Sequence, residues 1–364
     1  TKTVTAVVKL RPEAIAIGLL HSPANPSDEH RLQRALRRAM PDVPITCSAD
    51  LLPAFGEYER FSATILNAAV APAVGRYTSR VAADIGNGTL RLLRSSLGIL
   101  PPKEATEFPG RAMFSGPAGG VLATGQVSRR LKLNRAAAFD MGGTSADVCL
   151  VEHQSTVSND GTIAGLPLPL PTVPVHTVAA GGGSIAYRDA AGALRVGPHS
   201  AGADPGPACY GKGSEPTVTD AHVALGHLGP DTLLDGAFPI DVDASVRAIE
   251  GLGKQLGMRT RATAEGILTV ADATMARAIL VITAERAINP AHVPLVAYGG
   301  AGGLHAASLM KQLGMPSAIM PAFPGAFSAV GLALAGEATE ATEAISAIVT
   351  TDTLANILAQ GQEL

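Results

Sequence analysis

The sequence predicts an α/β fold in which sheets are covered by helices. Apolar runs of strand length alternate with segments whose apolar residues recur at helical spacing, which is the pattern of that class. Several strand-like runs end in clusters of glycine, and the chain combines 40 glycines with 46% hydrophobic residues. This mixture indicates a globular chain with tight loops, and 364 residues suffice for two domains.

The first third predicts strand and helix units followed by a long helix. In order, these are a strand at 14–20, a helix capped by Asn25 or Ser27 that runs to about Met40, a buried strand at 44–48, a helix at 57–85 kinked at Pro72, and a strand at 89–96. A proline-rich connection at 101–109 then leads to a tightly packed helix that starts in "FSGPAGG".

The remainder predicts a hairpin, a loop-rich segment and more helices. In order, these are strands in "AAAFDMGG" and "DVCLVE", a helix-poor stretch at 158–216 with a hairpin around 189–192, a helical region at 217–289 whose longest helix spans 263–288 and starts at Thr263, a strand at 293–298 that feeds a glycine turn and a helix, and a looser version of that pattern at 316–336. Such a long helix-poor stretch in a compact domain is usually functional.

Charge and cysteine content indicate which binding partners and which cellular compartment to expect. The 28 basic residues form no block longer than two and the net charge is −3, so no footprint for nucleic acid or an acidic membrane is predicted, and a small molecule or a protein is the expected partner. Cys47, Cys149 and Cys209 show neither CxxC spacing nor an even count. With no eighteen-residue apolar run and no signal-peptide pattern, we expect a cytoplasmic protein. The absence of a starting Met suggests a piece of a longer chain.

Three glycine clusters follow strand-like runs: "FDMGGTSADV" at 139–148, "AAGGGS" at 179–184 and "YGGAGGLHA" at 298–306. A phosphate chain needs backbone N–H groups with no Cβ in the way, and Gly142 and Gly143 would supply them. The hydroxyls of Thr144 and Ser145 could then bind phosphate oxygens. Asp140 and Asp147 could hold Mg²⁺ or orient an attacking group.

The third cluster suits the approach of an adenine, a ribose or its α-phosphate. Both readings compete with simple structural turns, because neither a Walker A loop nor a GxGxxG fingerprint is present. His199, Asp204, Cys209 and His222 could hold a metal, although such side chains in a Gly/Pro loop more often satisfy backbone groups. His305 could reach a phosphate or fill a seam between helix and sheet.

Five stretches carry a resemblance to a known family. "FSGPAGGVLATG", "AFDMGGTSADV", "VAAGGGSIA", "GPHSAGADPGPACYGKGSEPTVTDAHVALG" and "VAYGGAGGLHA" resemble, in this order, motifs of the hydantoinase A and 5-oxoprolinase family, which includes acetone carboxylase subunits. The resemblance extends less tightly over about 14–84 and to about 336. It implies an actin, sugar kinase and Hsp70-like ATPase fold (ribonuclease H-like), in which ATP binds between two halves that each supply a phosphate hairpin.

The resemblance also implies roles for individual residues. Asp140 and Asp147 would be catalytic and Asp140 would hold the metal, with ATP and Mg²⁺ as cofactors. The cofactor-binding residues would be Gly142, Gly143, Thr144 and Ser145 in the second phosphate hairpin and Gly299, Gly300, Gly302 and Gly303 in the adenosine turn.

The family's first Asp-x-Gly-Gly-Thr hairpin does not occur before residue 114. The resemblance therefore divides the chain into 1–112, the tail of the first ATPase-like half, 113–340, the second half with the nucleotide motifs, and 341–364, a C-terminal extension. In "RSSLGIL" at 94–100, Leu97 and Ile99 replace the family's Ser-Asn-Gly-Gly stretch and argue against a ligand contact there.

The implied activity is an ATP-dependent hydrolase that phosphorylates a cyclic amide at its carbonyl and so opens the ring. A hydantoinase B-type subunit or domain is the implied partner, in an oligomer. The alternatives are an acetone carboxylase-type subunit, a sugar-kinase-like phosphotransferase, and a non-catalytic half that binds its partner.

Overall fold

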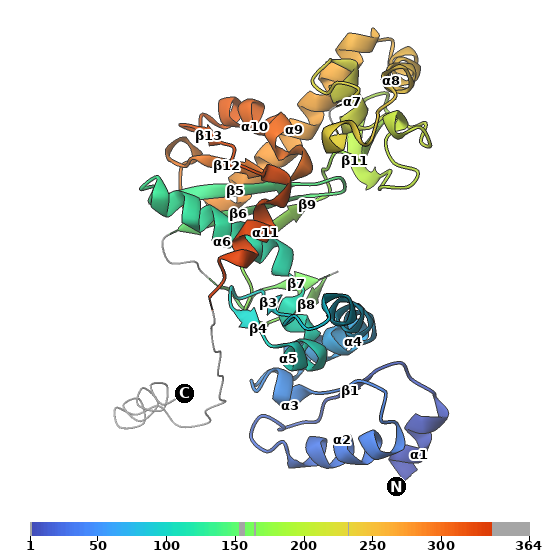
Figure 1. The fold of residues 1–364 in the computed structure, drawn as a ribbon, viewed down its shortest axis with the longest axis vertical. Coiled ribbons are helices and arrows are strands. Elements are labelled where there is room, and N and C mark those ends of the chain that lie inside the picture. The colour runs from blue at the N-terminus through green and yellow to red at the C-terminus, as the bar shows by residue number, and fades with distance from the viewer. Residues whose placement is uncertain (1, 153–156, 164, 232, 337–364) are drawn as a thin grey trace. The chain divides into compact units, whose positions relative to one another are not determined.

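The computed structural model describes residues 2–152, 157–163, 165–231 and 233–336, and its ribbon is shown in Figure 1. The mixture of helices and sheets confirms the predicted α/β class. Two compact units are present: the first holds described residues of 1–118 and 157–173, and the second those of 119–156 and 174–334. The extension expected at 341–364 lies outside the described residues.

The first unit consists of helices and three small two-stranded sheets, β1–β2, β3–β4 and β7–β8. Its elements are α1 (Lys2–Lys9), β1 (Ile15–Ile17), α2 (Ser27–Ala39), β2 (Ile45–Cys47), α3 (Ser48–Leu51), α4 (Glu57–Ile85), β3 (Leu92–Leu93), β4 (Ile99–Leu100), α5 (Pro102–Glu107), the 3₁₀ turn η1 (Pro109–Ala112), β7 (Thr162–Ile163) and β8 (Leu166–Pro167).

Most of the elements predicted for this unit are confirmed, with local differences. Helix α4 has the predicted ends and continues through Pro72. Helix α2 is capped by Pro26 without a side-chain bond, while Asn25 Oδ1 accepts from the N–H of Ser27 at 3.1 Å. Helices α1 and α5 were not predicted, because both are short and α5 begins in a proline-rich stretch that resembles a loop.

The second unit contains the larger sheet and most of the helices. Its elements are α6 (Ser115–Arg130, whose first residues belong to the first unit), β5 (Arg135–Met141), β6 (Ala146–Glu152), β9 (His176–Val178), β10 (Ser184–Arg188), β11 (Leu194–Ser200), η2 (Ala208–Tyr210), α7 (Val218–Ala224), η3 (Leu233–Gly236), α8 (Val242–Leu256), α9 (Thr260–Ala284), η4 (Pro290–His292), β12 (Leu295–Tyr298), α10 (Gly299–Leu313), β13 (Ala318–Ile319), η5 (Pro324–Ala326) and α11 (Phe327–Ala333).

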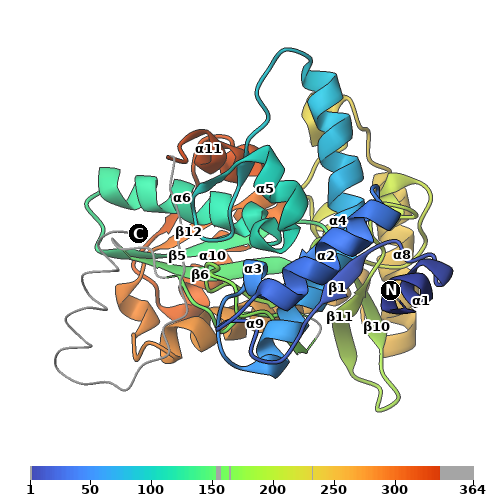
Figure 2. The same cartoon turned by 90° about the horizontal axis from the view of Figure 1, so that it is seen from below.

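Five strands form one sheet in the order β13-β12-β5-β6-β9. Strand β12 runs parallel to β13 and β5, whereas β5–β6 and β6–β9 are antiparallel. Helices α9 and α10 cover one face of the sheet and α6 the other (Figure 2). Since both faces are covered, the middle of β5, Ala136–Phe139, is almost completely buried, which explains its uninterrupted apolar run.

Helix α9 is the core helix of this unit. It starts at Thr260 and ends at Ala284, earlier at both ends than predicted, and Thr263 lies inside it with its hydroxyl donating to the carbonyl of Arg259 at 3.1 Å. The helix is long and apolar enough to cross a membrane, but 50% of its most apolar window is buried inside the protein. Ile267, Met275 and Ile279 are fully buried in the same core as β5, so core packing accounts for its composition.

The predicted close packing of the glycine-rich helix α6 is confirmed, and its neighbour is α11. A Cβ on Gly331 of α11 would collide with the carbonyl of Gly119 and approach the Gly119 carbonyl carbon to 2.6 Å. A Cβ on Gly119 would in turn meet the carbonyl of Ser328. The two backbones can therefore touch only because both positions lack side chains.

We expect Gly331→Ala to lower the free energy of unfolding by about 1–3 kcal/mol, because the added methyl must push backbone apart. Gly116→Ala on α6 is the matched control, since a Cβ there meets no heavy atom within 4 Å, and alanine favours a helix by up to about 1 kcal/mol. Urea unfolding measures both. Equal unfolding midpoints for wild type and Gly331→Ala would contradict this packing.

Candidate functional site

The β5–β6 hairpin turns over at residues 142–145, as predicted. The N–H of Gly142 donates to the carbonyl of Ser145 at 3.1 Å. Gly142, Gly143 and Thr144 are exposed, and a Cβ built on either glycine would meet no heavy atom within 4 Å. Among the described residues, the hydroxyls of Thr144 and Ser145 make no hydrogen bond within the protein. The turn thus presents backbone and hydroxyl groups to an open space.

Asp140 and Asp147 flank this turn as a directly opposed cross-strand pair. Ser328 Oγ donates to Asp140 Oδ2 at 3.3 Å, and Thr177 Oγ1 donates to Asp147 Oδ1 at 2.6 Å. Burial, and next the negative charge of Asp147, raise the pKa of Asp140 above its ordinary value, against a smaller opposing effect of the Ser328 bond. A cation between the two carboxylates would relieve both effects.

The second glycine cluster lies directly against the turn. Gly182 N–H donates to the carbonyl of Gly142 at 3.0 Å and Gly183 N–H to that of Gly143 at 2.7 Å. A Cβ on Gly181 would lie 2.6 Å from both the carbonyl carbon of Gly143 and the nitrogen of Thr144. The backbone of 181–183 therefore supports the turn from the protein side, a role that the local sequence did not reveal.

The third glycine cluster opens helix α10 beside Asp140, which confirms the predicted strand, glycine turn and helix. Tyr298 pairs with Asp140 across β12 and β5. The next residue, Gly299, has φ +82°, and a Cβ there would collide with Asp140 Oδ1 and lie 2.8 Å from the nitrogen of Met141. Only glycine fits both the left-handed backbone and this approach. The first turn of α10 therefore starts next to the acidic pair.

The other glycines of this cluster have different surroundings. Gly300 has no heavy atom within 4 Å of a Cβ position, so it adjoins open space. At Gly302 and Gly303 that position lies 3.5 Å from the carbonyl of Phe139 and 3.2 Å from Met320 Sδ, respectively. The ten residues predicted for the nucleotide site therefore gather where β5 and β12 end, with Gly302 buried and Gly303 exposed beside Met320.

This edge of the sheet has the chemistry of an anion site. Strand β12 ends where the 15-residue helix α10 begins, and no side chain caps that helix. The first four N–H groups of a helix lack intrahelical partners and carry a partial positive charge. Together with the open turn at 142–145, they can hold the phosphates and sugar of a nucleotide.

The carboxylates fit a magnesium ion shared with phosphates. Among the described residues, no group of three or more His, Cys, Asp or Glu side chains could hold a metal unaided. Mg²⁺ is often bound by one or two carboxylates together with phosphate and water oxygens, and Asp140 with Asp147 matches that mode.

Two of the other candidate metal residues have structural partners instead: Lys212 Nζ donates to Asp204 Oδ1 at 3.4 Å, and His222 Nε2 lies 3.2 Å from Nε2 of His305. Asp220, two residues before His222 on α7, accepts from the N–H groups of Ala208 and Cys209 at 3.0 and 2.9 Å and so holds this part of the loop in place. Burial, and then the charge of Asp220, raise the pKa of Cys209 to about 12, so its thiol is unreactive. His305 is 1% exposed and bonds to His222 of α7 and Asp272 of α9, so it is a buried residue as the structural alternative expected, but its seam lies between helices and not between helix and sheet.

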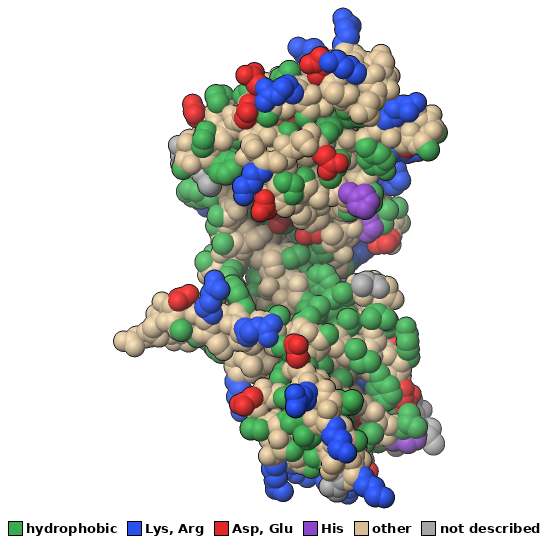
Figure 3. Space-filling model, turned by 90° about the vertical axis from the view of Figure 1, so that its right-hand side faces the viewer, with side chains coloured by type: hydrophobic (Ala, Val, Ile, Leu, Met, Phe, Trp, Pro, Cys, Tyr) green, Lys and Arg blue, Asp and Glu red, His purple; other side chains and the backbone are tan. Residues whose placement is uncertain are grey.

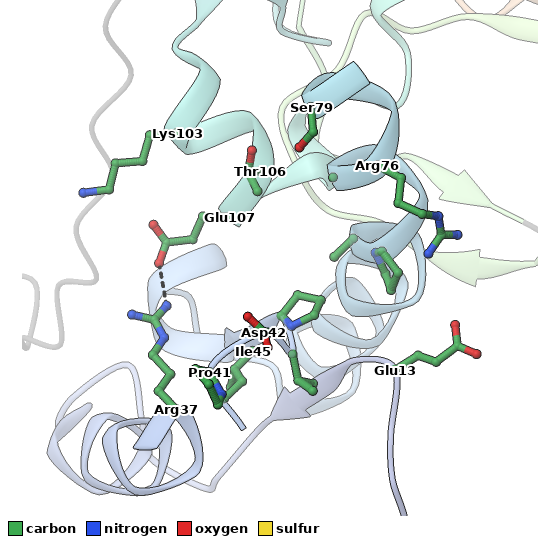
Figure 4. Close-up of a pocket in the computed structure, with 15 residues that line it drawn as sticks. Glu13, Arg37, Pro41, Asp42, Ile45, Arg76, Ser79, Lys103, Thr106 and Glu107 are labelled. Atoms are coloured by element: carbon green, nitrogen blue, oxygen red, sulfur yellow. Dashed lines mark hydrogen bonds and ion pairs between the residues drawn. The ribbon is translucent and has the colours of Figure 1, made fainter. Parts of the chain in front are cut away.

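The first unit contains a hollow of about 1250 Å³ that none of the predicted site residues lines. It lies beside β2, α4 and α5, and an ion pair of 3.1 Å between Arg37 and Glu107 closes part of its wall (Figure 4). Lys103 points away from the ion pair in this view.

On the face shown in Figure 3, acidic and basic side chains are interspersed, and neither sign of charge forms a large patch.

Comparison with known proteins places these features in a family. The family model "Hydantoinase/oxoprolinase" matches residues 60–341. Similar proteins include the uncharacterised protein MJ0964 of Methanocaldococcus jannaschii, 37% identical over 89% of this chain and 50% of its own length. The caprolactamase subunit alpha of Pseudomonas jessenii is 36% identical over 88% of this chain and 47% of its own length. The acetone carboxylase beta subunit of Xanthobacter autotrophicus is 33% identical over 89% of this chain and 46% of its own length.

Solved structures give the same picture. An ATP-dependent caprolactamase from Pseudomonas jessenii superimposes with a TM-score of 0.81 at 32% identity, covering 100% of this chain and 55% of that one. A nucleotide-free acetone carboxylase, from a study of ATP-dependent acetone carboxylation, superimposes with a TM-score of 0.79 at 31% identity, covering 92% of this chain and 48% of that one. The chain spans about half the length of these relatives. By sequence and by fold, it belongs to the hydantoinase/oxoprolinase family.

Proposed function

We propose that this chain is the nucleotide-binding part of an ATP-dependent hydrolase that opens cyclic amides. The observation that carries the proposal is the open turn at 142–145, flanked by Asp140 and Asp147 and adjoining the first turn of α10. The ATP-dependent caprolactamase among the similar structures supports it, because caprolactam is a cyclic amide.

The residues of the chain would divide the work of binding and charge neutralisation. The N–H groups of Gly142 and Gly143 and the hydroxyls of Thr144 and Ser145 would bind phosphate oxygens. Asp140 and Asp147 would hold Mg²⁺, and the first turn of α10 around Gly300 would accommodate the nucleoside. When bound, Mg-ATP would supply the phosphoryl group that activates the amide carbon toward water; the ring C–N bond then breaks, the nitrogen takes up a proton, and hydrolysis of the acyl phosphate releases inorganic phosphate. The chain's contribution is thus positioning and electrostatics.

A second subunit or domain is part of the proposal. Three of the relatives are named as alpha, beta or gamma subunits. We therefore infer that this chain works with a partner of the hydantoinase B type, which would complete the site for the amide. A carboxylase subunit is the second candidate, favoured by the similarity to acetone carboxylase.

The test is phosphate release by the complete enzyme that contains this chain. With ATP and Mg²⁺, a panel of lactams and hydantoins should stimulate phosphate release, whereas a ketone with bicarbonate should not. A lactam labelled with ¹⁸O at its carbonyl should transfer the label to inorganic phosphate. Stimulation by ketone and bicarbonate alone would favour the carboxylase, and no stimulation by either would overturn an enzymatic role.

A further inference from the structure

A row of three histidines, two of them buried, ends on a carboxylate in the second unit. His227, which follows α7, lies with its Nδ1 2.9 Å from Nδ1 of His222 on that helix. His222 Nε2 lies 3.2 Å from Nε2 of His305 on α10, and His305 Nδ1 lies 2.6 Å from Oδ1 of Asp272 on α9. His222 and His305 are 2% and 1% exposed, while His227 is exposed. The row therefore leads from the surface to the seam between α9 and α10.

The carboxylate at the inner end fixes the direction of every hydrogen bond. Asp272 accepts at both oxygens, since Ser308 Oγ donates to its Oδ2 at 2.5 Å. A neutral His305 must then donate through Nδ1 and accept through Nε2, so His222 donates through Nε2. His222 accepts through Nδ1 in turn, and His227 donates through its own Nδ1. The remaining nitrogen of the exposed ring, Nε2 of His227, is left as a proton acceptor.

We propose that His227, His222, His305 and Asp272 form a proton relay that takes up a proton at the surface and places its charge on His305, between α9 and α10. A proton binds His227 Nε2 and the Nδ1 proton of that ring passes to His222 Nδ1. The Nε2 proton of His222 then passes to His305 Nε2. His227 and His222 end neutral in the opposite tautomer and His305 ends as an imidazolium beside Asp272. The two hydrogen bonds between the rings persist with their directions reversed, while His305 Nδ1 donates to Asp272 throughout.

The surroundings of His222 favour this transfer. Burial first, and then the charges of His305 and His227, lower the pKa of His222 to about 3, so the central ring passes the charge on instead of keeping it. Several other charged groups on the packed elements are paired elsewhere: Asp220 of α7 with Ala208 and Cys209, Glu250 with Lys254 on α8, Arg261 with Glu265 on α9, and Asp140 of β5 with Ser328. Arg277 of α9 and Lys311 of α10 are exposed. Asp272 is thus the carboxylate that receives the charge.

The relay bears on α10 because His305 and Ser308 of this helix both bond to Asp272 of α9. The imidazolium form turns the hydrogen bond from His305 to the Asp272 carboxylate into an ion pair, in which both partners are charged and the contact is stronger. The same helix carries Gly299 and Gly300 in its first turn, beside Asp140. Uptake of one proton at the surface therefore strengthens the attachment of the helix at the glycine site.

Nitrogen NMR of the imidazole rings in the intact protein tests the relay without any nucleotide. At high pH His227 should show the Nδ1–H tautomer, which a solvated histidine disfavours, and His222 the Nε2–H tautomer. As the pH falls, both should change tautomer together while the charge appears on His305. If His227 becomes an ordinary imidazolium and the inner rings keep their tautomers, the relay is wrong.

Two variants sharpen this test. His227→Gln changes only an exposed residue, and it should abolish both the tautomer change of His222 and the transfer of a proton from the surface to His305. His199→Gln, an exposed position on β11, is the control and should leave all three rings unchanged. An unchanged titration of His222 and His305 in His227→Gln would overturn the proposal.

Discussion

Replacing Gly143 by alanine is expected to weaken binding of Mg-ATP strongly while leaving the fold intact. A Cβ at this position meets no heavy atom within 4 Å, and the residue has no left-handed φ, so the folded protein accommodates the methyl without strain. The methyl instead occupies the space in which a phosphate must approach the backbone. Overpacking of about 1–3 kcal/mol corresponds to a loss of affinity of about 10- to 100-fold, which calorimetric titration of the complete enzyme measures.

Two other glycines separate this effect from a folding defect. Gly181→Ala would place a methyl 2.6 Å from the backbone of Gly143 and Thr144, so it should lower both stability and affinity. Gly251→Ala on α8, where a Cβ also meets nothing within 4 Å, should change neither. If Gly143→Ala bound Mg-ATP as well as wild type, the turn would not be the phosphate site.

Replacing Asp140 by asparagine should maintain or raise the stability of the protein while it weakens the binding of Mg-ATP. Burial, and then the charge of Asp147, raise the pKa of Asp140 above its ordinary value of 3.8 in the folded chain. The folded state therefore holds the proton more tightly than the unfolded state, and stability is lost as the pH rises through the folded pKa. Asparagine removes that loss, so at pH 7 the variant should be at least as stable as wild type.

Binding of Mg-ATP should nevertheless fall, because asparagine carries no charge for the metal. Loss of a charged interaction of about 1.5–3 kcal/mol corresponds to about 10- to 100-fold in affinity. Below about pH 3.8 the difference in stability should disappear, since Asp140 is then protonated in both states. Calorimetry and thermal unfolding across pH measure the two effects.

Asp189→Asn is the control, because the pKa of Asp189 is lowered in the folded protein whereas that of Asp140 is raised. Hydrogen bonds from Arg195 and from the N–H of Ala193 lower the pKa of Asp189, which lies in the β10–β11 turn away from the acidic pair. Its removal should cost stability at neutral pH and leave nucleotide binding unchanged. A less stable Asp140→Asn that binds Mg-ATP normally would contradict the electrostatic account.

Local patterns predicted the elements that carry the candidate site. The apolar run of β5, the glycine pair and the return strand β6 lie within 18 residues, and their pairing determines the opposition of Asp140 and Asp147 without distant help. The strand, glycine turn and helix at 295–313 could be predicted for the same reason. The spacing of hydrophobic residues along the chain is enough to predict these strands and helices.

Partners distant in sequence could not be predicted in this way. Ser328 reaches Asp140 across 188 positions, and it does so because Gly119 and Gly331 let α6 and α11 touch. His222 meets His305 across 83 positions. The support of the turn by Gly181 depends on how the loop after β9 folds back, and the spacing of hydrophobic residues does not predict the path of that loop. Such contacts follow from packing, which overrides local propensity.

Hydrogen–deuterium exchange of the complete enzyme, with and without a non-hydrolysable Mg-ATP analogue, tests the central claim most directly. The exposed amides of the turn at 142–145 and those of the first turn of α10 should exchange more slowly when the analogue is bound. Protection confined to other segments, such as those around the hollow near Arg37 and Glu107 in the first unit, with unchanged exchange at 142–145, would contradict the account.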